Sequence, residues 1–377
     1  MLRPAIATLS TLFLVSPAAA EQTNAPAPTT PSKVKVETIA EGLANPWGLQ
    51  FLPDGRALIT EKPGTLRIVG KDGSKSDAIA GPPKVVDIDQ GGLLDVRLAP
   101  DFATSGTIYL SYAEARDGDK NGTSVASAKL VLDGKGGKLD DVKVIFRQEP
   151  AYASGYHFGS RIVIANDGTL FVTLGERNFL RAESQNPANH IGKVVHINAD
   201  GSPAGNNPKL PGWAPEVWSI GHRNIQGAAL DPATGELWTV EHGAKGGDEL
   251  NAPKAGKNYG WPIITYGVDY SGAKIGEGKA KDGMEQAVYY WVPSIATSGL
   301  TFYTGGLFPD WKGNLFVGGL KATQLQRLVL KDGAVVAAEI LLKDEGDRIR
   351  DVRQGPDGAL WVLTDDQDGK LLRLSPG

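Results

Sequence analysis

The sequence predicts an all-β protein, a six-bladed β-propeller with four-stranded antiparallel blades. Glycine and proline contribute 48 and 24 of the 377 residues, a composition typical of many short strands joined by turns. One hairpin pattern, a polar turn with glycine followed by four or five β-forming residues, occurs six times. About 340 residues shared by six copies gives roughly 57 each, close to a propeller repeat. Because a unit of three or four strands cannot bury both of its faces, six units are expected to stack around an axis.

The six copies follow one another along the whole chain after its N-terminal segment. They are the segments 52–61, 99–114, 164–176, 230–242, 308–320 and 355–366. Several continue into a third β-forming stretch, at 65–69, 193–197, 325–329 and 371–374. In a propeller the strand that leads into each hairpin is the innermost one. The starts of these six strands should therefore meet around one mouth of the central channel.

The N-terminal segment reads as an export signal. Arg3 precedes an apolar stretch from about residue 5 to residue 15, and residues 18–20 are all alanine. We expect residues 1–20 to be a signal peptide cleaved after about Ala20, so that the mature protein is soluble and periplasmic. Residues 21–35 are rich in proline and threonine and are expected to form a flexible linker. The propeller domain would then span residues 36–377.

Charge and composition indicate which kinds of ligand or partner the protein can bind. The formal net charge is −4 and no long basic run occurs, which argues against nucleic acid. The chain has no cysteine, so disulfides and a lipoprotein anchor are excluded. No apolar run after the signal approaches the ~18 residues that a membrane helix needs, so no membrane insertion is expected. A small-molecule ligand is the default, and the sequence leaves monomer and homodimer open.

Polar side chains mark the predicted starts of the innermost strands. They are Asn45, Gln90, His157, Arg223, Asn224, Thr297, Ser298, Arg348 and Arg350. Lys321 follows the hairpin strand of the fifth copy and could reach across the rim. One histidine would thus be surrounded by three arginines and a lysine. Because clustered cations are costly to desolvate, they should face either a polyanionic ligand or neighbouring carboxylates.

Two readings of this cluster stay open on spacing alone. Arg348 and Arg350 could pair with Asp347, Asp351 and other acids as structural salt bridges lining the channel, or they could bind a ligand. His157 taken alone is more often a structural histidine. Its place at a strand start beside arginines favours a catalytic role.

Two groups of residues could bind a metal ion, one through oxygen ligands and one through histidines. The loop after Gly243 offers backbone carbonyls with Asp248 and Glu249, the ligand type that calcium prefers, although such loops are also plain turns. His222 and His242 could suggest zinc together with Glu241, but no HxH or HExxH spacing supports it. No GxSxG, Walker loop or Rossmann fingerprint occurs after a strand, so serine hydrolase and nucleotide-binding functions have no support.

Motifs along almost all of residues 36–377 resemble one known family, the soluble quinoprotein glucose/sorbosone dehydrogenases. Within it, the resemblance is strongest to bacterial periplasmic aldose sugar dehydrogenases that use pyrroloquinoline quinone (PQQ). The motifs are NPWGLQFLPDG, QGGLLDV, HFGSR, NPANHIGKVVHI, GHRNIQG, EHGAKGGDELN, KNYGWP, GLK and DRIRDVRQGPDG. Together they are far more specific than any one alone. The six-bladed fold that this family implies agrees with the repeat count.

The resemblance also implies site residues. The general base would be His157, with Arg223 as a second catalytic residue. Cofactor contacts would come from Gln90, His157, Arg223, Asn224, Tyr270, Gly319, Leu320, Lys321, Arg348 and Arg350. A calcium ion that touches the cofactor would be held by the backbone carbonyls of Gly243 and Ala244. A second calcium ion would use Glu249 and the Tyr259 region.

Two positions depart from the family pattern. The family's glucose enzymes have an aspartate before the catalytic histidine, where this chain has Tyr156, so glucose specificity does not follow. They also have a proline at the position of Ala244, which matters little because the expected ligand is a carbonyl.

The reaction that the resemblance implies is oxidation of an aldose at C1 to an aldonolactone. Hydride would pass to PQQ, with His157 as general base and Ca²⁺ assisting. The electron acceptor, a quinone or a cytochrome, is unknown from the sequence. Two alternatives are a calcium-dependent propeller lactonase, which needs acids and an asparagine at the channel centre, and a non-catalytic exported propeller that binds a sugar or a protein.

Overall fold

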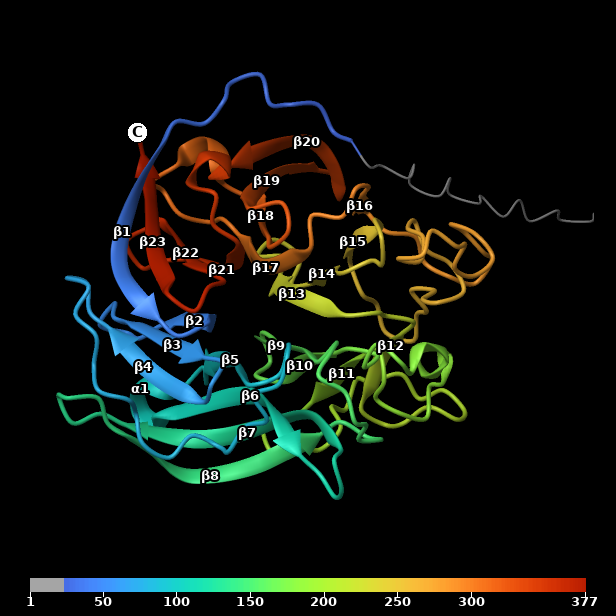
Figure 1. The fold of residues 1–377 in the computed structure, drawn as a ribbon, viewed down its shortest axis with the longest axis horizontal. Coiled ribbons are helices and arrows are strands. Elements are labelled where there is room, and N and C mark those ends of the chain that lie inside the picture. The colour runs from blue at the N-terminus through green and yellow to red at the C-terminus, as the bar shows by residue number, and fades with distance from the viewer. Residues whose placement is uncertain (1–23) are drawn as a thin grey trace, which may run out of the picture.

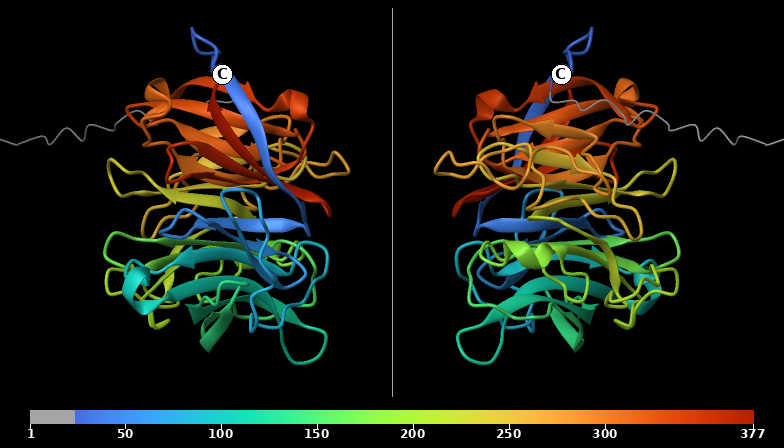
Figure 2. Two further views of the ribbon diagram at one scale, coloured as in Figure 1. Left: turned by 90° about the vertical axis from the view of Figure 1, so that its left-hand side faces the viewer. Right: turned by 90° about the vertical axis from the view of Figure 1, so that its right-hand side faces the viewer.

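Six antiparallel sheets surround a central axis in the computed structural model, which describes residues 24–377 (Figure 1). The predicted six-bladed β-propeller is confirmed. Seen from the side, the strands run between two faces that carry the loops (Figure 2). The predicted signal peptide falls on residues 1–20, outside the described residues. None of the helices formed by residues 24–377 has the length and apolar character that spanning a bilayer requires.

The blades follow the chain in order. Blade one contains β2 (Pro46–Phe51), β3 (Ala57–Glu61) and β4 (Thr65–Val69), and blade two contains β5 (Leu93–Leu98), β6 (Thr107–Ala115), β7 (Asn121–Val131) and β8 (Lys138–Arg147). Blade three contains β9 (Gly159–Ile164), β10 (Leu170–Leu174), β11 (Lys193–Ile197) and β12 (Val217–Ile220). Blade four contains β13 (Ile225–Leu230), β14 (Leu237–Glu241), β15 (Asp248–Asn251) and β16 (Tyr289–Trp291).

Blades five and six complete the ring. Blade five contains β17 (Thr297–Phe302), β18 (Leu315–Gly319), β19 (Gln324–Lys331) and β20 (Ala334–Leu341). Blade six contains β21 (Ile349–Gln354), β22 (Leu360–Thr364) and β23 (Gly369–Pro376), with β1 (Val34–Leu43) as its outer strand. Short helical turns occur at α1 (Phe102–Ser105), η1 (Arg181–Gln185), η2 (Pro309–Trp311) and η3 (Lys343–Glu345). Within residues 24–377, five of the sheets have the predicted four strands and the sheet of blade one has three.

Each of the six predicted hairpins forms the two inner strands of a blade. Gly168 and Gly358 show why the turns carry glycine, because their φ angles are 84° and 78°. A residue with a side chain is strained in this left-handed backbone conformation, whereas glycine adopts it readily. The turn residues therefore fix where each inner strand ends and its partner begins.

The two ends of the chain meet in blade six. Strand β1 pairs antiparallel with β23, from Val34 opposite Pro376 to Leu43 opposite Gly369, and the blue and red strands lie side by side in Figure 1. The strand begins two residues before the predicted domain boundary at residue 36. Hydrogen bonds between the N-terminal and C-terminal strands therefore close the ring.

Part of the segment predicted to be a flexible linker contacts blade five. The backbone N–H and the hydroxyl of Ser32 donate to the Glu339 carboxylate at 2.6 and 2.7 Å. The Ala338 N–H donates to the Pro26 carbonyl at 2.9 Å, and the Trp311 indole N–H donates to the Ser32 hydroxyl at 2.9 Å. The described part of this segment thus lies along β20, the outer edge of blade five.

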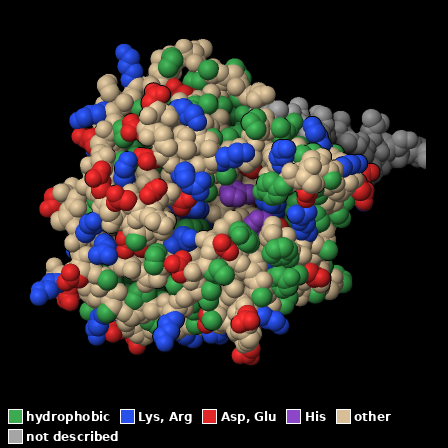
Figure 3. Space-filling view, in the orientation of Figure 1, with side chains coloured by type: hydrophobic (Ala, Val, Ile, Leu, Met, Phe, Trp, Pro, Cys, Tyr) green, Lys and Arg blue, Asp and Glu red, His purple; other side chains and the backbone are tan. Residues whose placement is uncertain are grey.

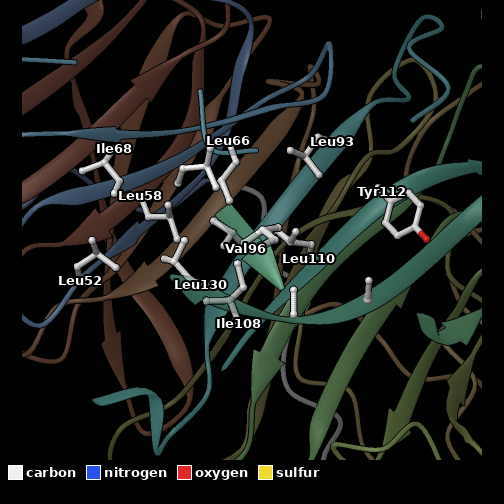
Figure 4. Close-up of a cluster of buried hydrophobic side chains, with 14 residues drawn as sticks. Leu52, Leu58, Leu66, Ile68, Leu93, Val96, Ile108, Leu110, Tyr112 and Leu130 are labelled. Atoms are coloured by element: carbon white, nitrogen blue, oxygen red, sulfur yellow. The ribbon is translucent and has the colours of Figure 1, made fainter. Parts of the chain in front are cut away.

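The hydrophobic core lies between neighbouring blades. Between blades one and two, Leu58 and Leu66 face Val96, Ile108 and Leu110, and all five are fully buried (Figure 4). Truncating such a leucine to alanine costs about 2–5 kcal/mol, because a cavity is added to the lost transfer energy. This packing holds the inner strands in fixed positions around the channel.

Candidate active site

The starts of the inner strands line one cavity. Its volume is about 260 Å³, and Figure 3 shows a central hollow in which histidine side chains lie with Lys and Arg side chains around them. The lining residues are Asn45, Trp47, Lys62, Asp89, Gln90, Gln226, His242, Ala296, Leu320, Arg348, Arg350 and Asp365. They come from five of the six blades, so the cavity exists only in the closed ring.

His157 stands just before β9 and is held from two neighbouring elements. Its side chain is 7% exposed and its φ is 52°. Its backbone N–H donates to Gln90 Oε1 at 2.9 Å, and its Nδ1 lies 2.8 Å from Glu176 Oε1. With the proton on Nδ1 donated to the carboxylate, Nε2 keeps its lone pair. This is the tautomer that a general base needs.

The surroundings keep His157 neutral. Burial, with the positive charges of Arg223 and Arg177, lowers the pKa of His157 well below its usual value. Burial also raises the pKa of Glu176 to about 7, although the same arginines oppose this. The contact is therefore a hydrogen bond from a neutral imidazole rather than an ion pair. Glu176 Oε2 is buried and has no hydrogen-bond partner.

Arg348 and Arg350 share one carboxylate. Nε and Nη2 of Arg348 donate to Asp365 Oδ2 at 3.0 and 2.6 Å, and those of Arg350 donate to Oδ1 at 3.1 and 3.0 Å. Burial raises the pKa of Asp365, but Arg350 and Arg348 outweigh it and lower this pKa to about 2. One negative charge thus faces two positive charges at the cavity wall.

The structural salt bridges considered for these arginines involve other partners. Asp347 pairs with Lys370 at 3.1 Å. Asp351 is buried and pairs with Arg161 at 3.2 Å and with Arg353 at 3.3 Å. Asp347 and Asp351 therefore do not pair with Arg348 or Arg350. The channel-lining salt bridges predicted with acids for these arginines do form, and their carboxylate is that of Asp365.

A chain of amides connects the arginines to the His157 segment. Arg350 Nη1 donates to Gln226 Oε1 at 3.2 Å, and Gln226 Nε2 donates to Asn224 Oδ1 at 3.2 Å. The Gly159 N–H donates to the same Asn224 oxygen at 3.1 Å. Because Asn224 Oδ1 accepts two hydrogen bonds, the orientation of the Asn224 side-chain amide is fixed. The Asn224 Nδ2 group is buried without a hydrogen-bond partner.

Arg223 is buried beside His157. Its backbone N–H donates to Glu241 Oε2 at 2.6 Å, and its Nη1 donates to the His242 carbonyl at 3.3 Å. The guanidinium carbon lies 5.2 Å from the centre of the Trp261 ring. Its Nε is buried and has no hydrogen-bond partner. Buried donors without partners are rare in folded proteins, so Arg223 and Asn224 both indicate an acceptor-rich ligand.

The remaining predicted cofactor residues divide into two groups. Leu320 lines the cavity, and Gly319 ends β18 just before it. Lys321 is exposed at the rim, Tyr270 is 65% exposed, and neither lines the cavity formed by residues 24–377. The Tyr270 loop is tied toward the η1 loop by an ion pair between Asp269 and Arg181 at 3.3 Å.

The candidate calcium residues lie around Glu241 and the turn after β14. The Gly243 N–H donates to Asp248 Oδ1 at 2.9 Å, and Ala244 follows in the same turn. Glu249 on β15 lies opposite Glu241 on β14. Asn251 Nδ2 donates to both carboxylates at 3.1 Å. Burial and then Glu241 raise the pKa of Glu249 well above its usual value, so this pair of acids favours a cation.

Histidine does not complete a metal cluster there. His222 Nδ1 lies 2.9 Å from Glu241 Oε1, whereas His242 Nε2 lies 2.7 Å from the Thr297 carbonyl. The Tyr259 ring stacks on His222 at 4.9 Å. Among residues 24–377 no three or more His, Cys, Asp or Glu side chains gather as a metal site. The zinc alternative therefore lacks a ligand set, and a calcium ion would need backbone oxygens such as those of Gly243 and Ala244.

Comparison with known proteins decides the family. The family model for glucose/sorbosone dehydrogenase matches residues 43–373. The chain is 45% identical to aldose sugar dehydrogenase YliI of Escherichia coli (strain K12) over 351 residues, which cover 92% of this chain and 94% of that protein. The chain belongs to the glucose/sorbosone dehydrogenase family.

Solved structures agree with this membership. The apo-form of the soluble aldose sugar dehydrogenase from Escherichia coli has a TM-score of 0.88 and 45% identity, over 91% of this chain and 100% of that chain. The PQQ-bound aldose sugar dehydrogenase from Streptomyces coelicolor has a TM-score of 0.77 and 30% identity, over 92% of this chain and 99% of that chain. Quinoprotein glucose dehydrogenase B of Acinetobacter calcoaceticus is 27% identical over 448 residues, which cover 96% of this chain and 92% of that protein.

The sequence motifs did not predict Glu176, Asp365 or Lys62 as residues of this site. A repeat-level signal for the two acids was available. Glu61, Glu176 and Glu241 each stand at or just after the end of the second strand of a blade, as does Asp365. Aligning the six hairpins would have placed all four acids at the mouth. For Lys62, one residue beyond this position, no comparable signal exists.

Proposed function

We propose that this protein is a PQQ-dependent aldose sugar dehydrogenase that oxidises aldoses at C1 to aldonolactones. The observation that carries the proposal is the pairing of His157 with Glu176 at 2.8 Å, beside a cavity lined by arginines. The named activity of the Escherichia coli relative and the PQQ bound by the Streptomyces relative support it. We also propose export to the periplasm, with a quinone or cytochrome as the later electron acceptor.

The donor set fits a planar polyanion. PQQ carries three carboxylates and an ortho-quinone, and arginine forks are suited to carboxylates. Arg348, Arg350 and Gln90 line the cavity, and the unpartnered Nε of Arg223 and Nδ2 of Asn224 supply further donors. These residues would hold the cofactor. When bound, PQQ supplies an electrophilic carbonyl that can accept hydride.

His157 performs the proton chemistry in this proposal. Its neutral Nε2 removes the proton of the C1 hydroxyl while the C1 hydrogen leaves with its electron pair, so that the lactone carbonyl forms. Glu176 holds the Nδ1 proton and thereby fixes both the tautomer and the ring orientation. Arg223 adds positive charge beside the base, which stabilises negative charge developing on the substrate oxygen.

Calcium would bind at two places. The backbone carbonyls of Gly243 and Ala244 would hold one ion near the cofactor, and Glu249 with the Tyr259 region would hold the second. Oxygen ligands of this kind suit Ca²⁺. When bound, the first ion supplies Lewis acidity.

The test uses the mature protein with calcium, with and without PQQ, in an aldose-dependent dye-reduction assay. Activity that needs both PQQ and an aldose supports the proposal. Dye reduction that is absent with PQQ present would overturn it, and lactone hydrolysis without PQQ would establish the lactonase alternative.

Substitution of His157 tests whether it is the general base. His157→Ala should lower kcat by ~10²–10⁴ because a general base contributes that much. His190→Ala is the matched control. His190 also contacts a carboxylate, that of Glu216, but its other ring nitrogen accepts the Glu149 N–H, so it has no free nitrogen to act as a base. A fully active His157→Ala enzyme would reject the assignment.

A further inference from the structure

We propose that Lys62, in the turn between β3 and β4, is an additional binding residue for the carboxylates of the cofactor. The inference rests on the proposed PQQ function and extends the donor set to blade one. Lys62 lines the cavity together with Gln90, Arg348 and Arg350. None of the sequence motifs that carry the family resemblance contains Lys62. Among residues 24–377, no other lysine lines this cavity.

The turn geometry holds the ammonium group at the cavity wall. Lys62 Nζ donates to the Asp89 carbonyl at 2.5 Å. Asp89 has a φ of 48°, and the next residue, Gln90, accepts the hydrogen bond from the His157 N–H. Close packing fixes the backbone as well, because a Cβ on Gly92 would stand 2.3 Å from the Lys62 carbonyl. Lys62 is therefore anchored to the segment that also positions the base.

The ammonium group keeps free donor capacity. A lysine has three N–H donors, and within residues 24–377 the side chain of Lys62 makes this one hydrogen bond and has no ion pair within 4.0 Å. The Asp365 carboxylate is already used by two guanidinium groups. Asp89 also lines the cavity, but it is exposed. Two donors of Lys62 thus remain for an anion in the cavity.

Electrostatic contacts place Lys62 beside the arginine pair. Burial lowers the pKa of Lys62 and Arg350 lowers it further, whereas Asp87, Asp365 and Asp89 raise it. Cations that repel one another across a partly buried wall are destabilising unless an anion fills the space between them. On the lining, Lys62, Arg348 and Arg350 give three positive charges against Asp89 and Asp365, and Asp87 acts on Lys62 from nearby. The carboxylates of a bound ligand would accept the N–H donors that these acids leave free.

A structural role is the competing explanation, because a lysine can simply cap the Asp89 carbonyl. Lys62→Gln separates the two, since glutamine can still donate to that carbonyl but carries no charge. Lys62→Arg keeps the charge. The matched control is Lys75→Gln in the segment after blade one, because Lys75 Nζ also donates to backbone carbonyls, those of Glu41 at 2.7 Å and Gly42 at 3.2 Å, outside the cavity lining.

The experiment is an equilibrium titration of cofactor-free protein with PQQ, followed by PQQ absorbance at several NaCl concentrations. Lys62→Gln should raise the Kd of PQQ about tenfold, because a charge-assisted hydrogen bond is lost. Its affinity should also depend less steeply on salt, because fewer charges are screened. Lys62→Arg should stay within about threefold of the wild type, and Lys75→Gln should be unchanged.

The outcomes distinguish the two proposals. A wild-type protein that does not bind PQQ overturns the proposed function and this inference together. A wild-type protein that binds PQQ, with an unchanged Kd in Lys62→Gln, overturns the role of Lys62 alone. Equal weakening in Lys62→Gln and Lys62→Arg also overturns it, because charge would then not be the determinant. Melting temperatures of the cofactor-free variants show whether any loss follows from unfolding.

Discussion

At the scale of single residues, the site depends on side chains that are distant in sequence. Motif reasoning could select His157 and Arg350 because their segments are distinctive. It could not select Glu176, which reaches His157 from the adjacent strand of the blade, or Asp365, which forms ion pairs with both Arg348 and Arg350. These contacts follow from the register between strands, and a one-residue shift in register would turn each side chain to the other face.

The pH profile should report on Glu176. The pKa of His157 is lowered well below 6.5, so the base stays neutral as the pH falls through 7. The pKa of Glu176 is raised to about 7, and below that pH the carboxyl group becomes protonated and no longer accepts the Nδ1 proton. We expect kcat/KM of the PQQ-loaded enzyme to fall below about pH 7 with a single limb.

Glu176→Gln checks this assignment. This variant should lose at least about tenfold in kcat, because an amide no longer selects one imidazole tautomer, and the limb near pH 7 should disappear. Glu216→Gln, which alters the carboxylate that contacts His190, should keep the wild-type profile. Persistence of the limb in Glu176→Gln would show that another group titrates.

At the scale of elements, the ends of the second strands carry most of the polar organisation. Glu61 accepts the Ala44 N–H at 2.9 Å, and Glu241 accepts the Arg223 N–H at 2.6 Å. Hairpin turns made these strands predictable. The sequence could not predict that the sheet of blade one has three strands among residues 24–377. Local β-propensity does not show which segment will find a pairing partner.

Two neighbouring acids, the buried Glu241 on β14 and the partly buried Glu249 on β15, predict that calcium stabilises the protein. Glu249 lies opposite Glu241, and burial raises its pKa well above the usual value. Calcium should raise the unfolding free energy of the wild type by about 2.7 kcal/mol at a hundredfold excess over Kd. Calorimetry in CaCl₂ and in EDTA measures this difference.

Glu249→Gln should remove the part of the calcium effect that comes from the second site. It should not lower the stability measured in EDTA, because a neutral amide adds no repulsion against the Glu241 carboxylate opposite it. Glu277→Gln is the control, since Glu277 is an exposed acid paired with Lys281. An equal calcium shift in Glu249→Gln and in the wild type would contradict the assignment of Glu249.

At the scale of the whole molecule, the sequence predicted the number of blades but not which strands close the ring. Six hairpins are visible in the sequence because each is local. The pairing of β1 with β23 joins segments more than 300 residues apart, and only the completed ring defines it. The same holds for Ser32, whose partners Glu339 and Trp311 lie in blade five.

Ser32→Ala tests the contribution of the N-terminal segment to stability. The hydroxyl donates to Glu339 and accepts from the Trp311 indole, so its loss should lower the unfolding free energy by about 1–3 kcal/mol. Urea unfolding measures this, and the Kd of PQQ should not change. Ser271→Ala, in a turn where the hydroxyl bonds to Asp269, should have little effect. Equal stability of the two variants would show that the N-terminal contacts contribute nothing.

The pairing of β1 with β23 also governs biosynthesis. The first strand of the domain waits unpaired until the codons for residues 369–376 have been translated. A premature stop codon would therefore yield an open arc with an unpaired strand edge rather than a smaller closed ring, and such edges promote aggregation. The edge of the first strand therefore stays available to other chains for longer than in a protein whose first two strands form a hairpin.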